Sequence, residues 1–588
     1  MRVLFQLSPD AASAPAPDAG ASLHFTVNGA EVEVVDDGAT LLEVLRDRLG
    51  ITSPKDGCSP QGQCGCCTVW VDGSPRVACV TPARRVAGRS VTTLEGLDDP
   101  VRRRWVDAIL SAGASQCGFC TPGIIMRLAG LEQRRDAVDE AAIERSLLAH
   151  LCRCTGWRTI VDAALAATGI DGAGFDATAP RDWESAGRRA TLEGGSPQRV
   201  GGAVVVGEGG FADDVAPVGS LVAVPDGAGG FAVAPTLSEA RRRAGKVQGR
   251  RSTAGPRHPV PVPDGDWELT LQTTWVEPAY LETDGSWCLP GGTPADSLAN
   301  GGAFGGKASS PVGAEARRLA DEHGQAVRVL WSREDVVRDG PKRPPVAAAI
   351  RLDGTGVIRI ASSQRCRTST DLPATGARAG HGATAREGDA GPGCAGPGGA
   401  GPGCHFDDEA RRAVEAAIGT VAPGLAVEWF AVDGPPLSTA VRGAGWVEAA
   451  VVAAALSLRD GGLDGWASVT SPSGGVAKAR VTAERVEVVV HPGPVLDAVV
   501  LRSYCIGAAH MAVSWVLSEY LAVSGEGEVQ DLTIRSFGVL TAGRTPRVAV
   551  KIVPGDGEPV AASDAVFAAV AAAAWAHAGF VPAWPVAP

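Results

Sequence analysis

The stretch Cys58-Ser-Pro-Gln-Gly-Gln-Cys64-Gly-Cys-Cys67 decides the fold of the first part of this chain, and Cys79 follows eleven residues later. In the plant-type arrangement, one short loop supplies three thiolates of a [2Fe–2S] cluster and the fourth comes from further along. The glycines of this loop suit it, because several backbone N–H groups must turn toward the sulfurs. We predict Cys58, Cys64, Cys67 and Cys79 as ligands, with Cys66 as the spare thiol.

A second cysteine group has iron–sulfur spacing as well. Cys117-Gly-Phe-Cys120 is followed after 31 residues by Cys152-Arg-Cys154. The first pair alone would favour zinc, but a Cys-x-Cys pair is poor for a zinc ribbon. A disulfide framework would suit a small secreted protein, whereas this chain has 588 residues and no secretory signal. We therefore predict Cys117, Cys120, Cys152 and Cys154 as ligands of a second [2Fe–2S] cluster, which makes electron transfer the expected role.

The sequence around each group predicts a different fold context. Apolar alternation over 23–34 around Asn28-Gly29 predicts a hairpin, residues 40–50 a capped amphipathic helix, and residues 68–78 another hairpin. This is the β-grasp order of a plant-type ferredoxin. From 99 to 166 the apolar residues recur at helical spacing, so the second group is expected among helices.

Composition excludes several other classes. The formal net charge is −12 and the pI about 5.4, so nothing indicates nucleic acid as a partner. No apolar run approaches 18 residues, and the Ala-rich stretch 561–576 is expected to form a packed helix, so we predict no membrane association. The first residues lack a basic region and a twin arginine, which predicts a cytoplasmic protein, in agreement with reduced thiolates.

Two motifs carry a resemblance to a known family. Gln116-Cys-Gly-Phe-Cys-Thr-Pro-Gly123 and Leu151-Cys-Arg-Cys-Thr-Gly156 resemble the small, iron–sulfur subunit of the molybdenum hydroxylases, which include xanthine dehydrogenase, aldehyde oxidase and carbon monoxide dehydrogenase. The resemblance covers residues 22 to about 165. Five residues separate Cys58 from Cys64 where the family usually has four, which we expect to leave the cluster intact.

The part of the chain from about residue 200 onward, called the second half below, resembles the large, molybdopterin-binding subunit of the same family. The resemblance is carried by fragments in family order: Gly207 to Asp214, Pro278-Ala-Tyr-Leu-Glu282 with proline in place of the family's histidine, Gly301-Gly-Ala-Phe-Gly-Gly-Lys307, Val441-Arg-Gly-Ala-Gly445 and Gly557-Glu-Pro559. The resemblance implies a molybdopterin cofactor near the Gly-rich turn and Gln116.

The same resemblance implies roles for single residues. Gly302, Phe304 and Gly305 would approach the molybdenum centre, with Gln116 facing the pterin; Arg442 would lie over the substrate and Glu558 would be the base beside the metal. A purely structural role stays open for the last two residues. Glu558 would then be a glutamate in a surface turn, and Arg442 an arginine that only stabilises the fold.

Departures from the family pattern bear on activity. This half is far shorter than a working large subunit, Ala308 stands where purine-oxidising members have glutamate, and no Gly-Gln-Gly-x-x-Thr element is present. Because a bulky buried cofactor needs a nearly complete shell, these departures favour a domain that has lost molybdenum chemistry and serves in docking or structure.

Three functions remain open. The chain is an electron-transfer component working with separate FAD-binding and molybdopterin-binding subunits on a small aldehyde or heteroaromatic substrate, or a fused active molybdenum hydroxylase, or an assembly protein that keeps the clusters for structure. Metal analysis separates the first two.

The expected fold class is α+β. The expected segments are a disordered tail (1–20), a β-grasp [2Fe–2S] domain (21–98), a helical [2Fe–2S]-binding domain (99–167), a linker (168–202), a mixed α/β molybdopterin-binding-like region in two parts (203–366 and 406–588) and a disordered Gly/Pro-rich insert between them (367–405). We interpret His150 as a partly exposed helix histidine, and Cys505 and His510 as core residues of an apolar helix over 503–521.

Overall fold

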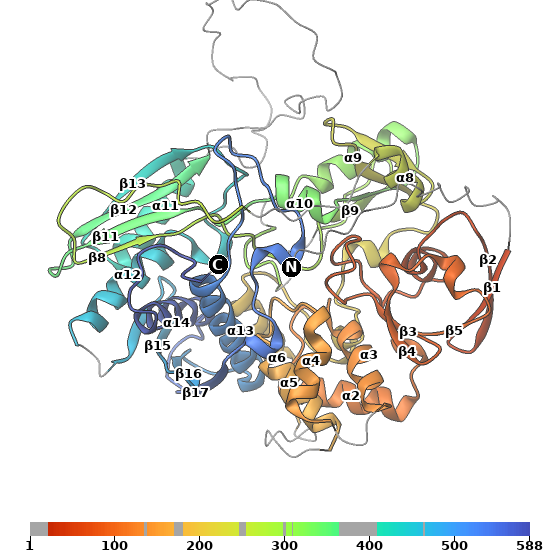
Figure 1. The fold of residues 1–588 in the computed structure, drawn as a ribbon, viewed down its shortest axis with the longest axis horizontal. Coiled ribbons are helices and arrows are strands. Elements are labelled where there is room, and N and C mark those ends of the chain that lie inside the picture. The colour runs from red at the N-terminus through yellow and green to blue at the C-terminus, as the bar shows by residue number, and fades with distance from the viewer. Residues whose placement is uncertain are drawn as a thin grey trace, which may run out of the picture.

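The structure is a computed structural model that describes residues 22–134, 138–169, 180–245, 254–297, 302–307, 310–363, 408–461 and 465–587 (Figure 1). The expected tail (1–20) and insert (367–405), and also Ala308, lie outside the described residues. In Figure 1 the red and orange N-terminal part of the chain lies at the right and bottom, and the blue C-terminal part lies mostly at the left.

The first domain has the expected β-grasp fold. Its sheet has the order β2-β1-β5-β3-β4, with β1 antiparallel to β2 and parallel to β5. The strands are β1 Ser22–Val27, β2 Ala30–Val35, β3 Thr68–Val71, β4 Ser74–Val77 and β5 Ser90–Thr92. The helix over 41–48 begins as α1 (Leu41–Glu43) and continues as one π-helical turn, and the Thr40 hydroxyl accepts the Glu43 N–H at its start. Both predicted hairpins are confirmed.

The second cysteine group lies among helices, as predicted. These are α2 Asp99–Ala112, α3 Thr121–Glu132, α4 Glu140–Ser146 and α5 Arg158–Ala167. Helix α3 packs on the β-grasp sheet, where the indole N–H of Trp70 donates to the Met126 carbonyl at 2.7 Å. This bond joins the two domains directly, so the two cysteine groups are held at a fixed separation.

The segment expected to be a linker is partly structured. Its described part contains α6 (Trp183–Gly194), which packs against α13 (Ala498–Leu517). The fully buried Arg189 pairs with Glu193 at 3.0 Å and donates to the Pro494 and Val560 carbonyls. A buried arginine needs such partners, and the polar composition that indicated a linker in fact serves this packing.

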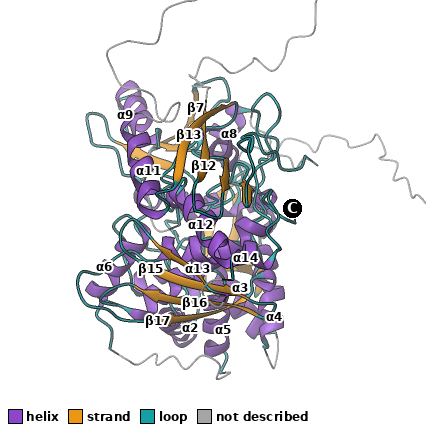
Figure 2. Cartoon of the chain, turned by 90° about the vertical axis from the view of Figure 1, so that its left-hand side faces the viewer, coloured by secondary structure: helices purple, strands orange, loops and turns teal. Residues whose placement is uncertain are grey.

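The second half has three four-stranded sheets within the described residues (Figure 2). Their orders are β7-β6-β10-β9, β13-β12-β11-β8 and β14-β15-β16-β17. The strands are β6 Leu221–Pro225, β7 Phe231–Ala234, β8 Leu269–Gln272, β9 Gly285–Cys288, β10 Val327–Leu330, β11 Val346–Ile350, β12 Gly356–Ser363, β13 Leu425–Val432, β14 Ala467–Thr470, β15 Val476–Val481, β16 Arg485–His491 and β17 Arg547–Ile552. Together with the first half, these sheets confirm the α+β class.

The second half has the helices α7 Gly202–Val205, α8 Leu237–Ala244, α9 Val312–His323, α10 Arg333–Asp339, α11 Asp408–Val421, α12 Trp446–Arg459, α13 and α14 Ser563–His577. Of these, α12, α13 and α14 are apolar and mostly buried, and they form the core. Helices α13 and α14 pack against each other and against the sheet β14–β17. The Ala-rich stretch is confirmed as a packed helix, and Cys505 and His510 are confirmed as core, each fully buried.

Two helical stretches, Val441–Arg459 and Ala498–Leu517, are long and apolar enough to cross a membrane by length and composition. Most of each is buried against the rest of the protein, which is what the core helices of a globular fold show.

Candidate iron–sulfur centres

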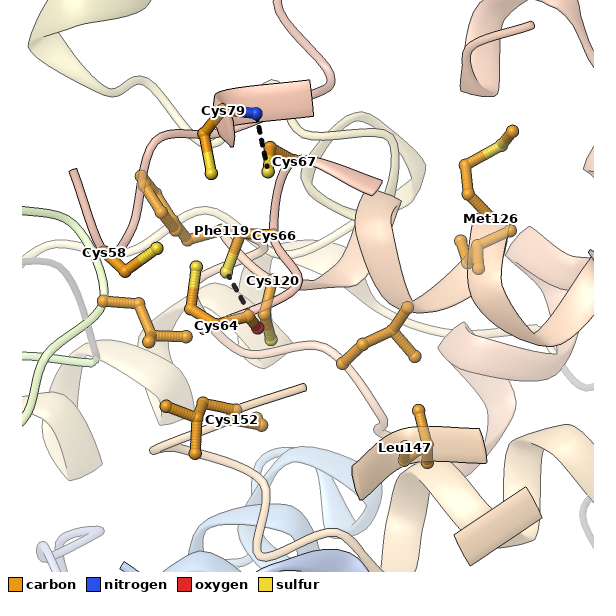
Figure 3. Close-up of a cluster of buried hydrophobic side chains, with 14 of the residues drawn as sticks. Cys58, Cys64, Cys66, Cys67, Cys79, Phe119, Cys120, Met126, Leu147 and Cys152 are labelled. Atoms are coloured by element: carbon orange, nitrogen blue, oxygen red, sulfur yellow. Dashed lines mark hydrogen bonds between the residues drawn. The ribbon is translucent and has the colours of Figure 1, made fainter. Parts of the chain in front are cut away.

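The first thiol group converges where the loop 58–67 meets β3 and the short helical turn after β4. Cys58, Cys64, Cys67 and Cys79 are at most 2% exposed, and their thiols lie together (Figure 3). The Cys58 thiol is in hydrogen-bonding contact with those of Cys64 and Cys79, and Cys79 also contacts Cys67. Apolar core packing does not require four buried thiols in contact with one another, so this group is a candidate set of metal ligands.

Backbone N–H groups point at these sulfurs, as an iron–sulfur loop requires. The N–H groups of Gln61 and Gln63 lie 3.3 and 3.4 Å from the Cys58 sulfur, and that of Cys79 lies 3.4 Å from the Cys67 sulfur. Such donors stabilise negative charge on cluster ligands.

The second thiol group lies between α3 and the loop 150–156. The sulfurs of Cys117 and Cys154 are 3.6 Å apart, and the Cys152 thiol contacts those of Cys120 and Cys154. The Thr155 hydroxyl lies 3.0 Å from the Cys152 sulfur. Cys120 is the residue at the N-terminus of α3, where the helix dipole favours a thiolate.

The arrangement fits two-iron clusters better than single ions. Within the described residues, no three His, Cys, Asp or Glu side chains converge tightly enough to hold one metal ion. The thiols instead form one connected group, in which Cys58 contacts Cys64 and Cys79 and Cys79 contacts Cys67, and a [2Fe–2S] cluster takes four thiolates. All eight thiols predicted from the spacing are brought together in two fours.

One residue beside the first group differs from the sequence interpretation. His150 was expected to be partly exposed on a helix, which is wrong: it is 2% exposed and packs against Gly65 of the cysteine loop. Its Nε2 lies 3.3 Å from the Thr68 hydroxyl. Burial lowers the pKa of His150 to about 3, so the imidazole stays neutral. Its closeness to Gly65 depends on long-range packing, which no local pattern signals.

The second half closes over both thiol groups. The Gln61 amide donates to Glu334 and to the Leu532 carbonyl, each at 2.8 Å, and fixes the first cysteine loop. On the second group, a Cβ added to Gly507 of α13 would lie 1.8 Å from the Cys154 carbonyl oxygen, so α13 touches that loop directly. The second half therefore helps to shape both cluster sites.

The residues that the resemblance assigned to the pterin lie beside the second group. The Gln116 amide donates to the Cys154 carbonyl and the Ser503 hydroxyl, both at 3.1 Å. A Cβ on Gly302 would lie 3.2 Å from the Cys154 sulfur, and one on Gly305 would lie 1.9 Å from the Ala440 carbonyl oxygen. The turn 302–307 is thus wedged between the second thiol group and the loop that carries Arg442.

Arg442 has its own protein partners. Its guanidinium stacks on the Phe304 ring at 3.9 Å from the ring centroid, and Nη1 bonds Asp564 at 2.8 Å. Glu558 is not brought to this place: it is exposed in the loop between β17 and α14. The structure therefore places Phe304 and Arg442 together and leaves the proposed base apart.

The space around Arg442 tests whether a molybdopterin fits. The cavity there measures about 20 Å³ and is bordered by Phe304, Arg442, Trp515 and Phe567 among others. A single water needs roughly 10–15 Å³ on the same measure, so this volume holds one or two waters. Within the described residues, the side chains at this place do not fit a bound pterin.

Two family models match the first part of the chain. Residues 25–86 match the 2Fe-2S iron-sulfur cluster binding domain, and residues 93–165 match the [2Fe-2S] binding domain. The fold and the two thiol groups together define the class of protein: the first part of the chain is an iron–sulfur unit that binds two [2Fe–2S] clusters.

Relatives extend this assignment to a family. The chain is 37% identical over 156 residues to the nicotine 6-hydroxylase small subunit of Paenarthrobacter nicotinovorans, covering 26% of this chain and 94% of that protein. It is 42% identical over 158 residues to the aldehyde oxidoreductase of Megalodesulfovibrio gigas, covering 25% of this chain and 16% of that protein. The chain belongs to the molybdenum hydroxylase family. The matched sequence spans only about a sixth of the length of the M. gigas relative.

A solved structure covers both halves. The aldehyde oxidoreductase from Desulfovibrio gigas aligns with 94% of this chain and 97% of its own, with a TM-score of 0.58 and 16% identity. At this identity the likeness shows the fold alone. Because the alignment covers 94% of this chain, the shared fold extends beyond the iron–sulfur domains into the second half.

Proposed function

We propose that the chain is the electron-transfer component of a molybdenum hydroxylase and passes electrons through its two [2Fe–2S] clusters. The observation that carries the proposal is that Phe119 lies between the two buried thiol groups. Its ring edge and the Cys64 sulfur each lie 3.1 Å from the point where a Cβ on Gly57 would stand, and the residue after Phe119 is Cys120. Cys58, Cys64, Cys67 and Cys79 would hold one cluster, and Cys117, Cys120, Cys152 and Cys154 the other.

The direction of electron flow, from a molybdenum centre to a flavin, is the one that the family resemblance implies, and exposure indicates where electrons would enter and leave. Cys117 is the one partly exposed residue among the eight cysteines, so a partner's molybdenum centre would deliver electrons to the helical-domain cluster there. Val80, which follows Cys79 and packs over Gly62, is 44% exposed, so electrons would leave near it. The acceptor would be a flavin on a separate FAD-binding subunit, and the substrate a small aldehyde or heteroaromatic compound at the partner's molybdenum.

The second half would serve these clusters as a cover instead of as a catalytic domain. The packed surroundings of Arg442 and the exposed position of Glu558 support this role. The second half would exclude water from the thiol groups and provide the surface on which partner subunits dock. We place the chain in the cytoplasm as a soluble component, where reducing conditions keep its free thiols available.

The proposal is tested on the purified full chain. Visible and electron paramagnetic resonance spectra should show two distinct [2Fe–2S] clusters and no FAD, and the lone chain should oxidise neither aldehydes nor purines. Adding molybdenum-containing and flavin-containing partner subunits should restore turnover. Substrate oxidation by the lone chain would overturn the proposal in favour of a fused enzyme.

A further inference from the structure

A fifth thiol is buried beside the first cluster site. Cys66 is fully buried, and its thiol is in hydrogen-bonding contact with that of Cys64. A Cβ built on Gly57 would lie 3.1 Å from the Cys64 sulfur and 3.3 Å from the Cys66 sulfur, so the two sulfurs border the same point. Figure 3 shows Cys66 beside Cys64 and Cys120. The thiol of Cys66 therefore faces the ferredoxin-type cluster on the side of the other cluster.

The backbone holds this thiol in place. The Cys66 carbonyl accepts the Lys55 N–H at 3.2 Å, and the same carbonyl would lie 2.8 Å from a Cβ on Gly123 at the start of α3. The Cys66 thiol also donates to the Cys64 carbonyl oxygen at 3.8 Å, so its side chain is held against Cys64.

We propose that Cys66 is a positioning residue that sets the reduction potential of the ferredoxin-type cluster. Its S–H donates to the Cys64 sulfur when that sulfur is a cluster ligand, which rests on the two-cluster function proposed above. A donor to a ligand sulfur stabilises the more negative, reduced cluster, so it raises the reduction potential. The effect belongs to the ferredoxin-type cluster, because Cys64 is assigned to that cluster.

The test compares Cys66→Ala and Cys66→Ser in the full, cluster-loaded chain. Redox titrations followed by electron paramagnetic resonance give the midpoint of each cluster, and the signal lost in Cys67→Ser identifies the ferredoxin-type one. In Cys66→Ala, the ratio of oxidised to reduced ferredoxin-type cluster at a fixed potential should rise up to about ten-fold. This corresponds to a midpoint potential that is lower by up to about 59 mV for one electron. Cys66→Ser retains a donor and should keep the midpoint close to that of the unsubstituted chain.

Cys505→Ala is the matched control, because it also removes a fully buried thiol and lies in the core of α13. It should move neither midpoint. An unchanged midpoint in Cys66→Ala would overturn the proposal, and so would the loss of half the iron, which would make Cys66 a ligand. Absence of both clusters from the unsubstituted chain would instead overturn the function proposed above.

Discussion

Arg153 and Glu519 form a buried, two-pronged ion pair that joins the second cysteine loop to the second half of the chain. Nη1 lies 2.6 Å from Oε1 and Nη2 lies 2.8 Å from Oε2, and the side chains are 8% and 1% exposed. The Arg153 Nε also donates to the Pro278 carbonyl at 3.0 Å. Since Arg153 stands between Cys152 and Cys154, the second half fixes the position of both thiols.

Glu519→Ala should therefore destabilise the protein and loosen the second cluster. Removing one member of a buried ion pair leaves the other charge unpaired, which costs about 3–5 kcal/mol. The expected result, measured by chemical unfolding and iron content, is lower stability with loss of the second cluster before the first. Glu132→Ala breaks the exposed pair with Arg104 and should cost under about 1 kcal/mol. Equal effects of the two substitutions would contradict the account.

Gly507→Ala tests the contact between α13 and the same loop. The added methyl group would lie 1.8 Å from the Cys154 carbonyl oxygen, and backbone cannot give way as a flexible side chain can. We expect the signal of the second cluster to be lost while that of the first remains. Gly419→Ala is the control in the exposed face of α11, where nothing lies within 4 Å, and it should be neutral or stabilising by about 1 kcal/mol. Retention of both clusters in Gly507→Ala would show that α13 does not contact the second cysteine loop at this point.

Local patterns predicted the parts of the fold that depend on local chemistry. Cysteine spacing, hairpin turns and helical periodicity depend on neighbours in the sequence, so both thiol groups and their domains could be predicted. The burial of His150 against Gly65, the packing of α6 and the stack of Arg442 on Phe304 depend on residues far apart in the chain. No periodicity encodes such contacts, and for the same reason Glu558 could not be placed from its motif alone.

The buried carboxyl group of Glu282 gives a pH dependence of stability. Burial raises the pKa of Glu282 to about 7, although Lys307 lies 2.7 Å away and opposes the shift. Because the folded pKa is above the ordinary value of 4.5, the folded state binds the proton more tightly than the unfolded state. Stability from this group is fully present below about pH 4.5 and is lost as pH rises through 7, by about 3 kcal/mol in total.

Glu282→Gln should remove this dependence. The amide does not titrate, so the difference between urea unfolding free energies at pH 5 and pH 8 should shrink relative to the unsubstituted chain. Glu558→Gln, at an exposed position, is the control and should leave the difference unchanged. A difference that persists in Glu282→Gln would assign the pH dependence to another group.

Single ligand substitutions should separate the two clusters. Cys67→Ser and Cys120→Ser each remove one predicted ligand, so each should lower the iron content by about half and abolish one of the two cluster signals. The two variants should lose different signals. Unchanged iron in either variant would refute the assignment of that cysteine.

The most direct test of the central claim is the metal content of the full chain as isolated. Two [2Fe–2S] clusters and a packed second half predict about four irons and no molybdenum per chain. The measurement is elemental analysis of protein produced in a host that makes molybdopterin, so that cofactor supply does not limit the result. One molybdenum per chain would contradict the account and make the chain a fused molybdenum hydroxylase.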